Sequence, residues 1–178
     1  SDDSISLVLG LGRERLDRGE MPDRVVKSPS DGLAEVFYNL SLLLHRQSAF
    51  YQQAGYGFEL VFARLAMDLR EDFDDARVLV AEIYETQERH RAAIAMYERV
   101  SPKTAWGWFG RIRIARNYDI LEEEDAAVRL LRKMAKERPD RIDVLVELGT
   151  LLRVHERYRE AVEVYSEAIE RTKKIEAR

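Results

Sequence analysis

The chain contains no cysteine and no apolar run long enough to cross a membrane, and these absences narrow its possible classes. Without cysteine it has neither disulfides nor thiolate metal sites, although this leaves its compartment open. A membrane span would need about 18 consecutive apolar residues. The acidic start, Ser1-Asp2-Asp3, is unlike a signal peptide. We therefore expect a soluble protein, cytoplasmic or exported.

Basic residues are too few and too scattered for a nucleic-acid-binding protein. The 29 Lys and Arg residues are outnumbered by 33 Asp and Glu residues, which gives a net charge of −4. Binding to nucleic acid without sequence preference needs clustered basic side chains, and no long basic block occurs. We therefore expect a protein or peptide segment, and not nucleic acid, as the partner.

Catalytic and metal-binding motifs are absent as well. The histidines, His45, His90 and His155, have no partner histidine four residues away, and no His-Glu-x-x-His sequence occurs. The acidic run around Asp74 lacks the glycine and the distant glutamate of a calcium loop. We expect no catalytic residue, no metal and no cofactor, and we expect His90 and His155 to be solvated residues of turns.

What the chain does contain is an internal repeat of 34 residues. Small residues recur at this spacing at two positions of the repeat, and large residues recur at a third. The small residues are Ala81, Ala115 and Gly149 at the first position and Ala93, Ala127 and Ala161 at the second; the large residues are Tyr97, Leu131 and Tyr165. This period is typical of a helix–turn–helix repeat. In each unit the small residues let the two helices approach closely, because larger ones would overpack the interface at a cost of ~1–3 kcal/mol.

These positions resemble the motif of the tetratricopeptide repeat (TPR) family, W-x2-L-G-x2-Y…A-x3-F…P. The last unit matches it at Leu145, Leu148, Gly149, Leu152, Ala161 and Tyr165. The resemblance covers residues 33–172 and departs from the motif at Arg77 and Arg111, which occupy its first position. It implies an all-α fold, a right-handed α-solenoid of antiparallel helix pairs, and suggests a fragment of a longer bacterial TPR-repeat protein.

The repeat predicts how the chain is divided. We expect residues 1–32 to hold a helix over 4–17, as a cap or a remnant of an earlier repeat, and a linker. Helix pairs follow at 33–70, 74–102, 105–138 and 140–172, and 173–178 form a tail. The first pair is degenerate, because six additional residues lie in a loop predicted over 48–57. Asp74 and Asp140 are predicted to cap the helices that follow them.

In the TPR family the first helices of the pairs line a concave groove that binds partners. The resemblance places eight candidate residues in this groove: Tyr38, Asn39, Leu42, Glu82, Phe109, Arg113, Arg116 and Glu147. Arginine forks bind carboxylates in bidentate fashion. Arg113 and Arg116 therefore either capture a partner's carboxylate or pair with acidic residues of this chain, Glu82, Glu147 or Asp119. Tyr38 and Leu42 either form an apolar pocket or pack against the N-terminal segment.

The last predicted helix carries more apolar residues than a terminal helix needs, since the ends of repeat arrays are usually polar. Val162 and Ile169 are therefore candidates for self-association through a homodimer, or for contact with further repeats. Two functions follow. The chain is either a non-catalytic protein–protein interaction module that binds a peptide or helix in the concave groove, or a self-associating segment of a larger multi-repeat assembly protein.

Overall fold

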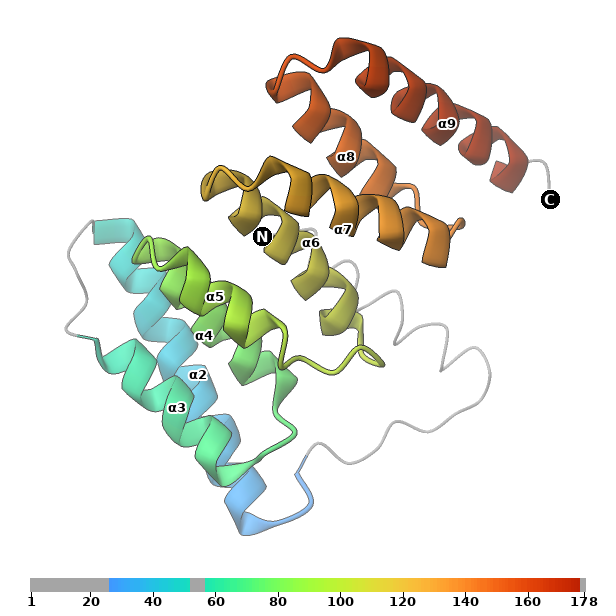
Figure 1. Ribbon diagram of the computed structural model, residues 1–178. Helices are drawn as coiled ribbons and strands as arrows, with labels where there is room; N and C mark the ends of the chain where they lie inside the picture. The colour runs from blue at the N-terminus through green and yellow to red at the C-terminus, as the bar shows by residue number, and fades with distance from the viewer. Residues whose placement is uncertain (1–25, 52–56, 177–178) are drawn as a thin grey trace. The chain divides into compact units, whose positions relative to one another are not determined.

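The computed structural model describes residues 26–51 and 57–176, and all regular structure within these ranges is helical. The helices, shown in Figure 1, are α2 (Pro29–Tyr51), α3 (Phe58–Leu69), α4 (Asp74–Thr86), α5 (His90–Tyr97), α6 (Ala105–Ile120), α7 (Glu124–Glu137), α8 (Asp143–Val154) and α9 (Tyr158–Glu176). The predicted all-α class is confirmed. The helix predicted over residues 4–17, and residues 52–56 of the predicted loop, lie outside the described residues.

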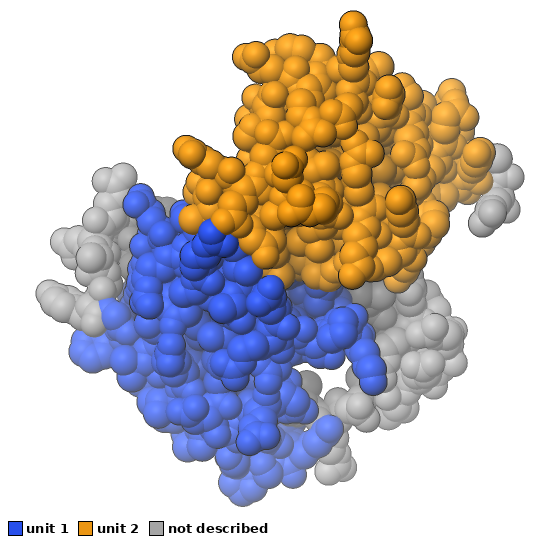
Figure 2. Space-filling model, in the orientation of Figure 1, with its two compact units in different colours: residues 1–110 blue, residues 111–178 orange. Residues whose placement is uncertain are grey.

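The chain divides into two compact units, residues 1–110 and 111–178, coloured separately in Figure 2. Unit 1 contains α2 to α5 and the first part of α6, and unit 2 contains the rest of α6 and α7 to α9. Alanine is prominent among the buried residues of both. The buried alanines are Ala34, Ala63, Ala66, Ala76, Ala81 and Ala93 in unit 1, and Ala115, Ala127, Ala135, Ala161 and Ala168 in unit 2.

Within each unit, helices that follow one another in the chain pack together. In unit 1, α2 packs on α3 and α4 packs on α5, while α3 also contacts α4. In unit 2, α8 packs on α9, and α7 contacts α8. The pairs approach closely at small residues. A Cβ atom added to Gly149 of α8 would lie 2.6 Å from the ring of Tyr165 of α9, so a larger residue at position 149 would displace that ring.

Helix α2 is longer than the first predicted helix at both ends. It begins at Pro29, inside the predicted linker, because a reciprocal cap forms there. The N–H of Asp31 donates to Ser28 Oγ at 3.1 Å, and the Asp31 carboxylate accepts the N–H of Lys27 at 2.9 Å. Proline is well suited to the first helical position. Without a glycine or proline to end it, the helix continues to Tyr51, into the predicted loop.

The two predicted aspartate caps are wrong. Helix α4 begins at Asp74 itself and has no side-chain cap; the Asp74 carboxylate instead accepts the backbone N–H of Ser101 at 3.2 Å and the hydroxyl of Thr104 at 3.1 Å. Helix α8 begins at Asp143, also without a side-chain cap, and Asp140 pairs with Arg138 at 2.6 Å. Side chains, including Arg77 for Asp74, and the backbone of distant residues bind these carboxylates in place of the expected helix N–H groups.

Three turns share an uncommon backbone conformation. Glu88, Glu122 and Glu156, spaced 34 residues apart, have φ values of 57°, 61° and 59°. The residue after each donates its N–H at 2.8 Å to a carbonyl five residues earlier, on Tyr84, Tyr118 and Leu152 respectively. This is the Schellman motif, in which the left-handed residue is usually glycine. A side chain in that conformation costs roughly 1–2 kcal/mol.

Replacing Glu156 by glycine should therefore stabilise the protein. We expect Glu156→Gly to raise the free energy of unfolding by about 0.5–1 kcal/mol, because glycine removes the left-handed strain while gaining some entropy in the unfolded chain. Urea denaturation followed by circular dichroism measures this. Glu163→Gly, in the exposed middle of α9, is the control and should lower stability by about 1 kcal/mol. A destabilised Glu156→Gly variant would contradict the proposed cost of this turn.

Candidate functional site

The predicted interaction residues of unit 1 lie on α2, α4 and the start of α6. Tyr38 of α2 is half-buried, and its ring packs at a tilt on Phe73, with centroids 5.2 Å apart. Burial, together with the negative charges of Asp75, Glu82 and Glu35, raises the pKa of Tyr38 to about 12. The Tyr38 hydroxyl is thus neutral and faces an acidic environment. The N-terminal segment, which was one of the two predicted surroundings of Tyr38, lies outside the described residues.

Asp75, at the start of α4, adds a half-buried carboxylate to this environment. Its Oδ1 accepts a hydrogen bond from Trp106 Nε1 at 3.1 Å. Burial raises the pKa of Asp75, because a carboxylate removed from water is less stable in its charged form, and the Trp106 hydrogen bond offsets part of this effect. Asp75 was not among the eight candidate residues, although it lies in the same acidic environment as Tyr38.

The connection between α3 and α4 contributes a cation that sequence reasoning missed. Arg70 forms a salt bridge with Glu35 of α2 at 2.8 Å, and its guanidinium lies 3.3 Å from the centroid of the Phe73 ring. Such a stacked, paired arginine holds two helices and the connection in one arrangement. Sequence reasoning missed the Arg70 salt bridge because its partner, Glu35, is 35 residues away.

Three further candidates of unit 1 differ in their surroundings. Asn39 is exposed, and its Nδ2 donates to the Glu35 carbonyl at 2.7 Å, whereas Leu42 is half-buried. Phe109 meets Trp106 and Tyr97 edge to face, at 5.7 and 6.4 Å between centroids. Unit 1 therefore combines Tyr38, Trp106 and Phe109 with carboxylates on α2 and α4.

In unit 2 the arginine at position 116 is paired within the chain. Arg116 Nε and Nη2 donate to the two carboxylate oxygens of Glu147, at 2.6 and 2.7 Å, and thereby join α6 to α8. This is the second of the two interpretations that the sequence left open for Arg116. Arg113 lies one turn earlier on α6, and its carbonyl accepts the side-chain amide of the buried Asn117 at 2.8 Å.

His155 lies in a turn, as predicted, but it is only partly exposed and is paired with carboxylates. It follows α8, and its Nε2 lies 2.5 Å from Asp119 while its Nδ1 lies 3.4 Å from Glu124. The hydrogen bond to Asp119, and the negative charges of Asp119 and Glu124, raise the pKa of His155. Asp119 lies 36 residues earlier in the chain, so only the stacking of successive pairs brings the two side chains together. His45, on α2, behaves oppositely: burial lowers its pKa.

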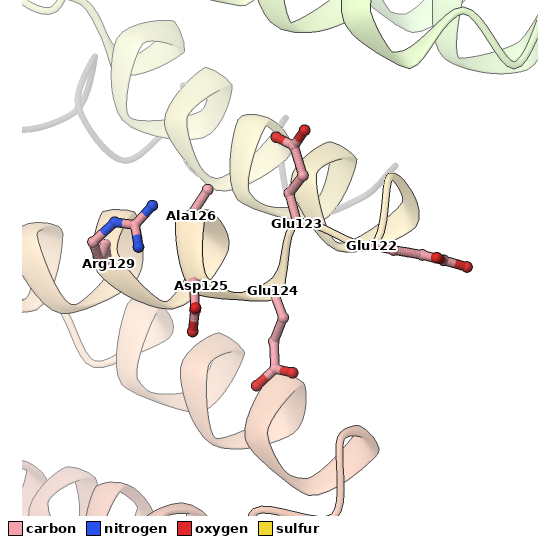
Figure 3. A pocket seen from close by; sticks show the side chains of 6 residues that line it. All are labelled: Glu122, Glu123, Glu124, Asp125, Ala126 and Arg129. Carbon is pink, nitrogen blue, oxygen red and sulfur yellow. The ribbon is translucent and has the colours of Figure 1, made fainter.

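A shallow cavity of about 510 Å³ lies at the start of α7. Figure 3 shows its lining, which is acidic apart from Ala126 and Arg129: Glu122, Glu123, Glu124, Asp125, Ala126 and Arg129. Carboxylates at a helix N-terminus are stabilised by the helix dipole. Glu124 also accepts a hydrogen bond from Arg157 at 2.6 Å. Packing and helix electrostatics therefore account for these residues.

Residues 26–51 and 57–176 contain no group of three or more His, Asp or Glu side chains arranged to hold a metal ion. None of the helices in this part of the chain has the length and apolar character of a membrane span. The self-association candidates Val162 and Ile169, by contrast, are both exposed on α9.

Comparisons with known proteins identify the fold. No family model and no curated protein sequence matches the chain. A crystal structure of MamA matches with a TM-score of 0.59 and 16% identity, covering 82% of this chain and 81% of that one. MamA from Desulfovibrio magneticus RS-1 gives a TM-score of 0.59 and 15% identity, over 97% of both chains.

YrrB, whose structure is described as that of a TPR protein with an unusual peptide-binding site, matches with a TM-score of 0.52 and 16% identity. The match covers 76% of this chain and 66% of YrrB. At these identities the likeness concerns the fold alone. The chain has the helical-repeat fold of TPR proteins, as its motif predicted.

The His155–Asp119 pair should make stability depend on pH. Because the pKa of His155 is raised on folding, its charged contribution is fully present below the unfolded pKa, near 6.5, and is lost as pH rises through the folded pKa. His155→Gln should therefore cost about 0.5–1 kcal/mol at pH 5.5, as expected for a partly exposed pair, and less at pH 8.5. Urea denaturation at both pH values measures the difference. In an Asp119→Asn background this pH dependence should shrink; a difference that persists unchanged there would exclude Asp119 as its main cause.

Proposed function

We propose that this TPR-like chain is a non-catalytic protein-interaction module, and that unit 1 binds an extended or helical segment of a partner through α2, α4 and the start of α6. The fold supports this proposal, because exposed faces of stacked helices offer long surfaces for extended segments. YrrB, which is similar in fold, is described as having a peptide-binding site. We propose Tyr38, Asn39, Leu42, Glu82 and Phe109 as the contact residues of unit 1.

The observation that carries the proposal is the half-buried carboxylate of Asp75 beside Tyr38 and Trp106. Burial raises the pKa of Asp75, so its negative charge lacks full solvation. A cation placed beside it would restore that stabilisation, and the charges of Glu82 and Glu35 would act in the same direction. Arg70 already pairs with Glu35, so it compensates only part of this acidity.

The aromatic residues define the second requirement for the partner. Trp106 and Phe109 are half-buried and meet edge to face, and Tyr38 packs on Phe73. Aromatic side chains of this kind are frequent among the residues that contribute most to binding energy. We therefore propose a partner segment in which Lys or Arg residues alternate with apolar ones.

Unit 2 offers a surface of different character. We propose Arg113, Arg116 and Glu147 as its contact residues. A partner's carboxylate would have to displace Glu147 from Arg116, which is bound at 2.6 and 2.7 Å. The net gain from such an exchange is small, because one bidentate pair replaces another. We therefore propose that unit 2 adjusts binding and that unit 1 supplies most of the affinity.

Selection from a displayed library of random peptides tests the proposal without knowledge of the partner. We expect the selected peptides to be basic and apolar, with dissociation constants that fluorescence anisotropy can measure. Asp75→Asn keeps the size of the side chain and removes its charge, and should weaken binding about tenfold, or 1.4 kcal/mol. Binding to the unchanged chain should also weaken on acidification, as the carboxylate of Asp75 takes up a proton.

Glu98→Gln, an exposed change after the end of α5, is the matched control and should leave binding unchanged. Two results would contradict the proposal. Affinity that Asp75→Asn leaves intact would remove the carboxylate from the site. A preference for acidic peptides, lost in the double variant Arg113→Glu with Arg116→Glu, would assign binding to unit 2 instead.

A further inference from the structure

Helix α9 exposes an apolar stripe that its counterpart in the preceding repeat buries. Val162 and Ile169 follow Val128 and Ala135 of α7 by 34 residues each. In α7, which contacts the following helix α8, those two residues are 6% and 5% exposed. In α9, Val162 is 64% and Ile169 is 56% exposed. The exposed face of α9 therefore corresponds to the face of α7 that packs on α8, the first helix of the following pair.

Helix α2 shows the complementary feature. Ser41 of α2 occupies the position of Ala81 in α4 and of Gly149 in α8. In this alignment the apolar residues Val36, Leu40 and Leu43 of α2 correspond to Ala76, Val80 and Ile83 of α4. The corresponding residues of α8 are Val144, Leu148 and Leu151. All six matched residues are at most 7% exposed. In α4 this register faces the preceding helix, since Ala76 clusters with Ala66 of α3. In α2, however, Val36 is 59% and Leu43 is 54% exposed.

Helix α3, the partner of α2, exposes apolar side chains as well. Phe37 of α2 stacks on Phe62 of α3, with centroids 5.8 Å apart, and both helices expose apolar side chains. Those of α3 are Phe58, Val61 and Leu65. Exposed apolar surface of this extent usually marks an interaction site.

We propose that a second copy of this chain covers these surfaces, with α2 of one copy packed on α9 of the next. Within the chain, the second helix of one pair packs on the first helix of the next pair: α3 packs on α4 in unit 1, and α7 packs on α8 in unit 2. The contact between two copies would repeat this packing. One kind of contact then covers the stripes of both helices. The segment of residues 4–17, with Ile5, Val8 and Leu9 on one predicted face, could cover only one of the two at a time.

This association is head to tail, so it differs from a two-fold dimer. Each copy uses two different surfaces, and each added copy leaves one α2 face and one α9 face open. The result is an open chain of copies or a closed ring, and the mean mass rises with protein concentration. A two-fold dimer would stop at two copies.

Two variants of the full chain, each with one blocked surface, separate these cases. Val36→Glu with Leu43→Glu places charges on α2, and Val162→Glu with Ile169→Glu places charges on α9. All four positions are more than half exposed, so the fold should tolerate the changes, which circular dichroism verifies. Sedimentation velocity should show that the unchanged chain forms larger species at higher concentration and that each variant alone stays monomeric.

The equimolar mixture of the two variants is the decisive sample. It should contain dimers and nothing larger, because the first variant keeps its α9 face and the second keeps its α2 face. A control with Gln87→Glu and Ala95→Glu, at exposed positions outside both stripes, should associate like the unchanged chain.

Three results would overturn the proposal. A mixture that remains monomeric would exclude the α2-to-α9 contact. A variant that still dimerises with itself would indicate a two-fold interface. An unchanged chain that stays monomeric up to millimolar concentration would show that no second copy covers these faces.

Discussion

The structure depends on the close approach of neighbouring helices at small residues. Alanine or glycine occupies the contact positions at a spacing of 34 residues, and the helices meet without room for larger side chains. At Gly149 the ring of Tyr165 occupies the space of a missing Cβ. The spacing of these residues, rather than any single strong interaction, sets how one pair stacks on the next.

In such a fold, the first helix of a pair that follows another pair has two apolar sides. One side packs on the second helix of the same pair, and the other packs on the preceding pair. In α4 every large apolar residue is buried, and in α8 all are buried except Val146 and Val154. In α2 the second side is exposed, although its residues follow the same register. The apolar stripe on α2 is therefore a consequence of the repeat itself, and it carries information about which kind of helix fits there.

The parts of the structure that the sequence predicted are those that local periodicity determines. The 34-residue spacing indicated helix pairs, and Gly149 and Ala161 marked their contact. One local signal was misinterpreted, because Ser28 and Asp31 form a cap that was assigned to a linker. Glu156 gave no signal, since the left-handed conformation that it adopts is usually taken by glycine. Ser101, Trp106 and Asp119, which bind Asp74, Asp75 and His155 respectively, are 27 to 36 residues away from them, so stacking determines these contacts and no local pattern could.

Those distant partners show how the two units use charge differently. In unit 2 the arginine and histidine contacts join successive helices: Arg116 to Glu147, Arg157 to Glu124 and His155 to Asp119. Such pairs are largely satisfied inside the chain, and a ligand must compete with them. In unit 1 the carboxylate of Asp75 is held by the neutral indole of Trp106, and its raised pKa reflects a charge that burial has only partly compensated. A cationic partner therefore gains more from unit 1, since it supplies a stabilisation that the chain itself leaves incomplete.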